Sequence, residues 1–244
     1  MRSSTNKISA VVLHTLKYRD TSLLVYAYTD LFGRQTYLVN GVRSSKNKSG
    51  MACFQALSLL DAVAYHRPKN DIQRLKEYHL STPLQNLAFD IHKNAMALFM
   101  GEVVYKTVRE QEPNEQLFHF LRQSVLELEN IEDGAANYHL YFLARLTAYL
   151  GFASGNDYKS EHTYFDISSG EFTPVRPKHE LFFDAEQTAL FGRLLKAEIS
   201  DLPNIGLHHH QRSAFVNNML RFYEHHFDAL SPIRSWTVLS EVYA

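Results

Sequence analysis

The sequence predicts an α+β protein, in which a small five-stranded barrel or sheet is followed by a mainly helical region. Residues 8–80 contain short apolar runs rich in Val, Leu, Tyr and Thr, separated by turn residues, which is typical of β-strands. From Leu84 onward the spacing of apolar residues changes from two to about 3.6, the period of an α-helix. Because Ser81-Thr82-Pro83 is a helix-start signal, we expect a domain boundary between residues 82 and 83.

Five strands are expected before this boundary. Three lie between Ile8 and Asn40, a fourth covers residues 54–66, and the fifth covers Ile72–Leu80. The turns between them are predicted at Arg19-Asp20-Thr21, Leu31-Phe32-Gly33-Arg34 and Arg67-Pro68-Lys69-Asn70-Asp71. Five strands in about 75 residues match the size of a small barrel.

The segment between the third and fourth strands differs from the rest of this region. Gly41–Gly50 has no apolar periodicity, three cations and no acid, with small residues around each charge. A loop of this composition is suited to contact with phosphates.

The remainder of the chain contains periodic apolar runs separated by breaks. One helix is expected from Leu84 to Val108, and the next is capped by Asn114 and reaches Leu128. Four more are predicted at Tyr138–Leu150 with Gly151 as its left-handed end, from the cap Asp184 to Lys196, at Ser213–Phe227 and at Ser235–Tyr243. A β-hairpin is expected near residues 162–175, around Ser168-Ser169-Gly170.

The composition is that of an ordinary globular protein, with 45% hydrophobic and 21% charged residues. No run approaches the roughly 18 apolar residues of a membrane helix, and the first residues do not resemble a signal peptide. We therefore expect a cytoplasmic protein. Cys53 is the only cysteine, which excludes an intramolecular disulfide and a thiolate zinc cage.

The formal net charge of −1 conceals an uneven distribution. Residues 1–80 contain 12 Lys and Arg against 5 Asp and Glu, whereas the rest of the chain contains 13 against 21. A basic front half joined to an acidic back half is typical of a nucleic-acid-binding module attached to a region that does not bind nucleic acid.

Several ordered motifs resemble those of the RecO family of bacterial DNA repair proteins. In the N-terminal part these are Val11-Val12-Leu13, Asp20-Thr21-Ser22-Leu23, Thr29 followed by Phe32-Gly33-Arg34, Gly41-Val42-Arg43-Ser44-Ser45-Lys46, and Phe54-Gln55-Ala56-Leu57. The family's terminal motif resembles two C-terminal segments, Arg221–His226 and Pro232–Ser235.

The resemblance implies an OB-fold DNA-binding domain over residues 1–82 and a helical domain over 83–244, the latter containing the small hairpin. It also implies a recombination mediator of the RecF pathway that binds single- and double-stranded DNA, anneals complementary strands and helps to load recombinase. The implied partners are RecR, the C-terminal tail of single-strand-binding protein and, indirectly, the RecA filament. No cofactor and no membrane contact are expected.

This chain departs from the family pattern in two places. Many RecO-like proteins carry a cysteine-rich zinc module where this chain has Gly151–Asp157, which contains no cysteine. RecO-like proteins also often have a lysine immediately before the loop glycine, where this chain has Asn40.

Single-stranded DNA is held by cations that follow the phosphates and by aromatic faces on which bases stack. Tyr18, Tyr26, Tyr28 and Tyr37 offer such faces or fill the barrel core. The predicted DNA-binding residues are Lys17, Arg19, Arg34, Tyr37, Arg43, Lys46, Lys48, Arg67, Lys69, Arg74 and Lys76.

Cations of the helical region are candidates for binding protein partners. The resemblance implies an apolar pocket rimmed by cations for the acidic, phenylalanine-ended tail of single-strand-binding protein. The candidate rim residues are Lys106, Arg109, Arg122 and Arg145, each of which is otherwise a solvated helix cation.

No arrangement of catalytic residues is apparent, so we expect a protein that is not an enzyme. The runs His208-His209-His210 and His225-His226 invite a metal site, but adjacent helical side chains point about 100° apart and do not converge. Two alternatives stay open: an adaptor whose basic barrel binds an acidic protein, and a hydrolase with dispersed catalytic residues. Oligonucleotide binding separates the first from a DNA-binding protein.

Overall fold

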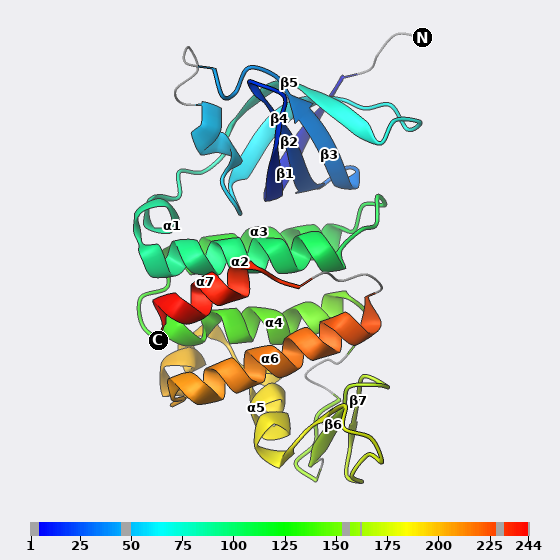
Figure 1. The fold of residues 1–244 in the computed structure, drawn as a ribbon, viewed down its shortest axis with the longest axis vertical. Helices are drawn as coiled ribbons and strands as arrows, with labels where there is room; N and C mark the ends of the chain where they lie inside the picture. The colour runs from blue at the N-terminus through cyan, green and yellow to red at the C-terminus, as the bar shows by residue number, and fades with distance from the viewer. Residues whose placement is uncertain (1–4, 45–49, 153–156, 162, 228–231, 244) are drawn as a thin grey trace. The chain divides into compact units, whose positions relative to one another are not determined.

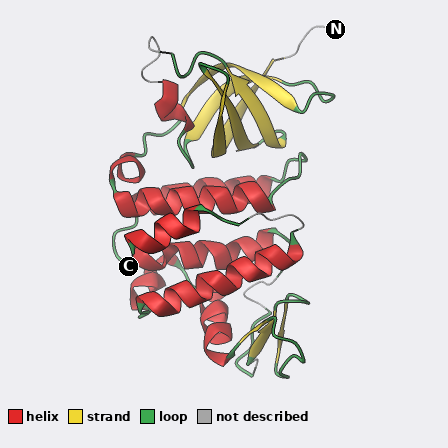
Figure 2. Ribbon diagram, viewed as in Figure 1, coloured by secondary structure: helices red, strands yellow, loops and turns green. Residues whose placement is uncertain are grey.

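The computed structural model describes residues 5–44, 50–152, 157–161, 163–227 and 232–243. The chain divides into two compact units, Met1–Glu129 and Asn130–Ala244, which are described separately below. Strands form a barrel in the first unit and a small sheet in the second, and helices account for most of the rest (Figure 2). The predicted α+β class is confirmed.

The first unit begins with a closed five-stranded barrel, drawn in blue to cyan in Figure 1. Its strand order is β1-β2-β3-β5-β4, with β4 pairing back to β1. The β3–β5 pairing is parallel and the other four pairings are antiparallel. The strands are β1 (Thr5–Tyr18), β2 (Ser22–Thr29), β3 (Gly33–Val39), β4 (Leu59–Tyr65) and β5 (Ile72–Leu80). This is a five-stranded barrel of the OB type, as predicted.

The fourth strand is shorter than predicted. The segment after the Gly41–Gly50 stretch forms a 3-10 helix, η1 (Gly50–Phe54), and β4 starts only at Leu59. Leu57 lies between them with a left-handed φ of 62°, and its N–H donates to the Val12 carbonyl at 2.7 Å. The prediction of a continuous strand over 54–66 is wrong at its start, because an apolar run can be buried by a turn as well as by a strand.

Three α-helices complete the first unit: α1 (Gln85–Phe89), α2 (Ile91–Thr107) and α3 (Glu115–Asn130). The single helix predicted over 84–108 is therefore two. Asp90 separates them, because its side chain accepts hydrogen bonds from the backbone N–H groups of His92 and Lys93 and so starts a new helix. The predicted cap at Asn114 is confirmed, since its side chain accepts from the Leu117 N–H at 3.0 Å.

β5 ends at Leu80 and α1 begins at Gln85, so the predicted boundary at residues 82 and 83 falls in the link between them. That this link limits an independent domain stays a prediction.

The second unit is mainly helical and contains a small three-stranded sheet of order β7-β6-β8. Its α-helices are α4 (Tyr138–Tyr149), α5 (Ala185–Lys196), α6 (His209–His226) and α7 (Ser235–Val242). Its strands and 3-10 helices are β6 (Tyr164–Asp166), β7 (Glu171–Thr173), β8 (Phe182–Phe183), η2 (Ala135–Asn137) and η3 (Ile199–Asn204). Gly151 follows α4 with a left-handed φ of 85°, as predicted.

α6 begins four residues earlier than the periodicity indicates. The His208 N–H donates to the Gln211 side chain at 2.9 Å. This bond gives the backbone N–H of the N-cap residue a partner, so the helix can start before the apolar run begins. β8 was also not expected, because two residues carry no recognisable period.

Phenylalanine rings pack between the small sheet and α5. The ring of Phe165 lies 4.9 Å from those of Phe172 and Phe191 and 5.3 Å from that of Phe183, centroid to centroid. This part of the chain follows the position at which many RecO-like proteins carry a zinc module. The chain's only cysteine is Cys53, so the residues present do not fit a thiolate zinc site, and aromatic rings in tilted and edge-to-face contact supply the core instead.

None of the helices within the described residues combines the length and the apolar character needed to cross a membrane.

Candidate nucleic-acid interface

The turn between β1 and β2 is bonded to the segment that follows β3. The Arg43 backbone N–H donates to the Thr21 carbonyl at 3.0 Å, and the Arg43 guanidinium donates to the Arg19 carbonyl at 3.3 Å. Ser22 adds a side-chain bond to Asn40 at 3.1 Å. The predicted residues Arg19 and Arg43 are therefore brought together, although 24 positions separate them in the sequence.

Two local features produce this arrangement. Gly41 takes a left-handed φ of 71° directly after β3, and Ser44 closes the turn by donating from both its N–H and its hydroxyl to the Gly41 carbonyl. Lys17, near the end of β1, is exposed beside the same turn. Lys46 and Lys48, predicted to contact phosphate, lie outside the described residues.

A second group of cations lies along β5 and the turn before it. Arg67 and Lys69 are exposed in the β4–β5 turn, and Arg74 is exposed on β5. In the sheet register Arg74 pairs with Tyr65 of β4 and with Leu38 of β3. Leu38 is next to the end of β3, from which the chain continues to Arg43.

The register therefore links the two groups across neighbouring strands. We call them together the basic surface, made of Lys17, Arg19, Arg43, Arg67, Lys69 and Arg74. Among the described residues, none of these six side chains forms an ion pair with a carboxylate. Lys76, the remaining predicted residue of β5, is exposed but pairs with Glu77 at 3.2 Å.

An aliphatic row crosses the outer face between these cations. Leu16, Leu24, Leu38 and Arg74 are successive register partners on β1, β2, β3 and β5. Leu16 is 43% exposed, and Leu24 and Leu38 are partly exposed. The outer face thus presents leucines next to the cations, together with the partly exposed rings of Tyr18 beside Arg19 and Tyr65 beside Arg74.

Arg34 does not belong to the basic surface. Its guanidinium donates to the Val108 carbonyl at 3.0 Å and lies 4.6 Å from the centre of the Tyr105 ring. Burial lowers the pKa of Arg34, whose charge is held within the first unit between the barrel and α2. These contacts indicate a role in packing and argue against the predicted phosphate contact.

The tyrosines are mostly unavailable as stacking platforms. Tyr37 is 1% exposed in the barrel core, and burial raises the pKa of its hydroxyl. Tyr28 is equally buried, with its hydroxyl accepting from the Asn114 N–H. The Tyr26 ring packs edge-on against Tyr105 at 4.8 Å. We correct the prediction for Tyr37: a ring enclosed by the barrel cannot receive a base. Among the four, Tyr18, under the Arg19 guanidinium, and Tyr26 are partly exposed.

The four cations predicted to bind protein partners are divided between the two units. In the first unit, Lys106 pairs with Glu102 at 2.8 Å on α2, while Arg109 and Arg122 are exposed after α2 and on α3. In the second unit, Arg145 of α4 donates to the Ala197 carbonyl at 3.3 Å.

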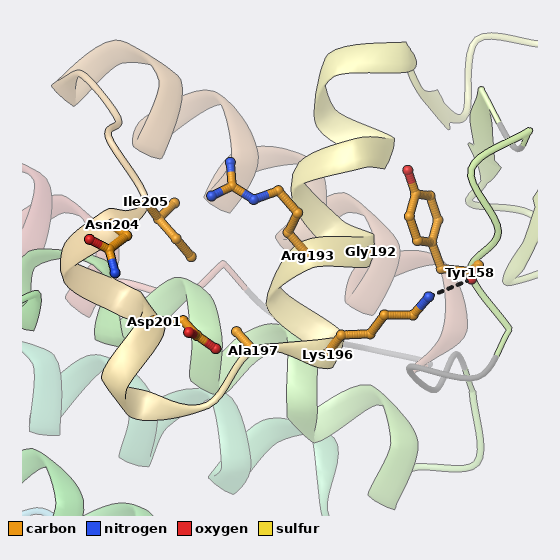
Figure 3. Close-up of a pocket in the computed structure, with 8 residues that line it drawn as sticks. All are labelled: Tyr158, Gly192, Arg193, Lys196, Ala197, Asp201, Asn204 and Ile205. Atoms are coloured by element: carbon orange, nitrogen blue, oxygen red, sulfur yellow. Dashed lines mark hydrogen bonds between the residues drawn. The ribbon is translucent and has the colours of Figure 1, made fainter.

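Ala197 lines a hollow of about 340 Å³ in the second unit (Figure 3). Arg193 extends from α5 toward Ile205, and Lys196 donates to the Tyr158 carbonyl at 2.9 Å (Figure 3). The Tyr158 ring packs so closely on α5 that a Cβ at Gly192 would lie 2.3 Å from it. The hollow therefore combines apolar, aromatic and cationic groups with the carboxylate of Asp201 and the amide of Asn204.

Sequence reasoning missed Arg193 and Lys196. Both lie in the last turn of α5, three residues apart and so on one face of the helix. This spacing was a usable signal, but nothing in the sequence indicates that η3 returns beside that face.

The histidine runs do not build a metal site in the part of the chain that the structure describes, where no three His, Cys, Asp or Glu side chains gather as potential ligands. His208 and His210 stack with ring centroids 5.8 Å apart, and His226 bonds the Ile167 carbonyl at 2.7 Å.

Comparison with known proteins adds a second line of argument. A family model described as "Recombination protein O N terminal" matches residues 1–84, and one described as "Recombination protein O C terminal" matches residues 88–236. A protein of Bacteroides fragilis named DNA repair protein RecO is 33% identical over 238 residues, covering 97% of this chain and 98% of its own length. Proteins of the same name from Flavobacterium psychrophilum and Phocaeicola vulgatus are each 31% identical, with 98% of this chain and 99% of theirs covered.

Proposed function

This chain belongs to the RecO family, and from that membership we propose that it acts in DNA repair as a recombination mediator that binds single- and double-stranded DNA and anneals complementary strands. In this proposal the barrel binds DNA through the basic surface, and the protein works with RecR to help load recombinase. It does so without catalysing a covalent step.

The observation that carries the proposal is the basic surface. Six exposed or partly exposed cations lie on neighbouring strands and turns of one barrel, and none is neutralised by a carboxylate among the described residues. Phosphate oxygens are the groups that such cations bind most readily, and each contact releases condensed counterions. An OB-type barrel also binds oligonucleotides across strands 2 and 3 and the loops that flank them.

The accessible side chains favour a binding mode dominated by phosphates. Tyr28 and Tyr37 are buried and Tyr26 packs against Tyr105, so few rings are left for base stacking. A strand held by its backbone keeps its bases available for pairing. Neutralising the phosphates of two such strands lowers their mutual repulsion, which is the step that annealing requires.

The hollow beside α5 supports the proposed contact with single-strand-binding protein. An acidic tail that ends in phenylalanine needs cations for its carboxylates and an apolar wall for its ring. Arg193 and Lys196 supply the first, and Ala197 and Ile205 the second. Arg145 supports the wall through its bond to Ala197, whereas Lys106, Arg109 and Arg122 lie in the other unit and stay separate candidates.

Fluorescence anisotropy with a labelled oligo(dT) tests the DNA-binding proposal. Replacing Arg19 and Arg43 together by glutamine is expected to weaken binding at least several-fold and to slow annealing of complementary oligonucleotides. Lys178→Gln, which removes an exposed cation of the second unit, is the matched control and is expected to change neither. Wild-type protein that binds no oligonucleotide at low salt would favour the protein-binding adaptor.

The tail contact is tested with a labelled acidic peptide ending in phenylalanine. Arg193→Gln with Lys196→Gln is expected to abolish its binding while leaving oligo(dT) binding intact. Equal peptide binding by this variant and the wild type would exclude the hollow.

A further inference from the structure

We propose that Gln73 is a positioning residue, which holds the β4–β5 turn in the conformation that presents Arg67 and Lys69 to a DNA backbone. This inference deepens the proposed function and rests on it. It concerns a buried amide that makes no contact with DNA itself.

Gln73 faces the inside of the barrel, where it pairs in register with Tyr37 and is 3% exposed. The neighbours Ile72 and Arg74 point outward, as the alternation of a strand requires. Inward positions of this barrel are otherwise mainly apolar. Because a buried amide is unfavourable unless its polar atoms are bonded, a glutamine at this position needs specific partners.

Those partners are all in the turn. The Gln73 side-chain oxygen accepts from the Arg67 N–H at 2.9 Å. The side-chain nitrogen donates to the Arg67 carbonyl at 2.8 Å and to the Asn70 carbonyl at 2.7 Å. A fourth bond, from the Asn70 N–H to the Arg67 carbonyl at 2.9 Å, closes the turn itself. One side chain thus binds both backbone groups of Arg67 and the far end of the turn.

The turn has little other support. Arg67, Pro68, Lys69, Asn70 and Asp71 are all exposed, so no packing fixes the backbone between them. Without the amide, the turn would sample more conformations, and DNA binding would have to order it. Ordering an interface segment on binding costs conformational entropy, so a turn that is already ordered strengthens binding without adding a contact.

Mutations can separate the charges that the turn presents from the hydrogen bonds by which Gln73 orders its backbone. Arg67→Gln with Lys69→Gln removes both charges but leaves the backbone groups that Gln73 binds. Gln73→Met keeps the length and the inward packing but cannot bond the turn. Gln73→Glu keeps the acceptor for the Arg67 N–H and loses both donors, and it serves as the second variant should methionine disturb the fold.

The experiment measures oligo(dT) affinity of the full chain in a double-mutant cycle. We expect Gln73→Met to weaken binding about three- to tenfold, with a folded barrel and at most a modest fall in the thermal midpoint. Added to the Arg67→Gln, Lys69→Gln variant, it should have no further effect, because it acts only through those two side chains. Gln73→Glu should give the same pattern of binding, but with a lower thermal midpoint, because it buries a carboxylate against two carbonyl oxygens.

Four results would overturn the inference. An equal loss in both backgrounds would mean that Gln73 supports the barrel generally. No loss of oligo(dT) affinity in either background would mean that the hydrogen bonds of Gln73 are not needed to order the turn for binding. If Arg67→Gln with Lys69→Gln binds normally while Arg19→Gln with Arg43→Gln does not, the turn lies outside the interface and only the proposed function survives. If neither double variant affects binding, the basic surface itself is wrong.

Discussion

The guanidinium of Arg43 donates a hydrogen bond to the main-chain carbonyl of Arg19, 3.3 Å away, and the Arg43 N–H donates to the Thr21 carbonyl. Arg19 itself has a left-handed φ of 51°, a conformation that disfavours side chains with a Cβ. The two arginines are therefore linked by geometry as well as by charge, and the turn that carries Arg19 is held in a strained conformation.

Arg19→Gly should separate stability from DNA binding. Glycine relieves the left-handed strain, worth about 1–2 kcal/mol, and this gain offsets its entropic cost of about 0.5–1 kcal/mol. We expect a thermal midpoint no lower than that of the wild type, together with weaker oligo(dT) binding. A clear fall in the midpoint would show that the Arg19 side chain stabilises the turn.

The buried tyrosines lead to a prediction about bases. An abasic oligonucleotide of the same length as oligo(dT) should bind with an affinity within a few-fold of it, because stacking, worth roughly 1–3 kcal/mol per base where it occurs, contributes little on this face. Anisotropy titrations at one salt concentration measure this. A loss of a hundredfold or more on removing the bases would mean that partly exposed rings of the barrel, such as Tyr18 and Tyr65, stack on bases after all.

Gly33 is predicted to be essential for joining the β2–β3 turn to the α2–α3 loop. It has a left-handed φ of 58°, and a Cβ on it would lie 2.3 Å from the Glu112 carbonyl oxygen. Gly33→Ala should destabilise the first unit by about 1–3 kcal/mol in urea unfolding. Gly41→Ala is the matched control, since it has a similar φ of 71° but nothing within 4 Å of the added Cβ. Equal losses for the two would show that the close approach is unimportant.

His139 makes stability depend on pH. Burial, together with the smaller effect of the Arg212 charge, lowers the pKa of this imidazole from 6.5 to about 3. The unfolded chain therefore takes up a proton below pH 6.5 that the folded chain refuses until about pH 3, so stability falls as the pH is lowered through this window. The slope from this one residue approaches about 1.4 kcal/mol per pH unit.

Unfolding midpoints measured from pH 7 to pH 4 should fall less steeply for His139→Phe than for the wild type. His79→Gln, at an exposed position of β5, should follow the wild type. Parallel curves for His139→Phe and the wild type would contradict the assignment.

The sequence predicted what depends on local chemistry. Three kinds of signal lie within a few neighbouring residues: the change in the spacing of apolar residues, the helix caps at Asn114 and Asp184, and the helix-ending Gly151. The structure confirms them. The break at Asp90 was missed because an apolar period continues across it and only the side-chain capping bonds reveal it.

Side-chain orientation was the less predictable part of the site. Arg34 and Arg43 read alike in the sequence, as cations beside a glycine turn. One is held against Tyr105 and the other lies beside Arg19, and the difference arises from a helix about 70 residues later in the chain. Gln73 appeared to be an ordinary polar residue of a strand, because its partners are backbone groups that a sequence does not distinguish.

The salt dependence of oligo(dT) binding tests the central claim most directly. Each single-strand phosphate contact contributes about 0.7 to the slope of log K against log salt. Replacing Arg43, Lys46 and Lys48 together by glutamine is predicted to reduce the magnitude of that slope by up to about 2, and a slope equal to that of the wild type would contradict the assignment of DNA to this side of the barrel.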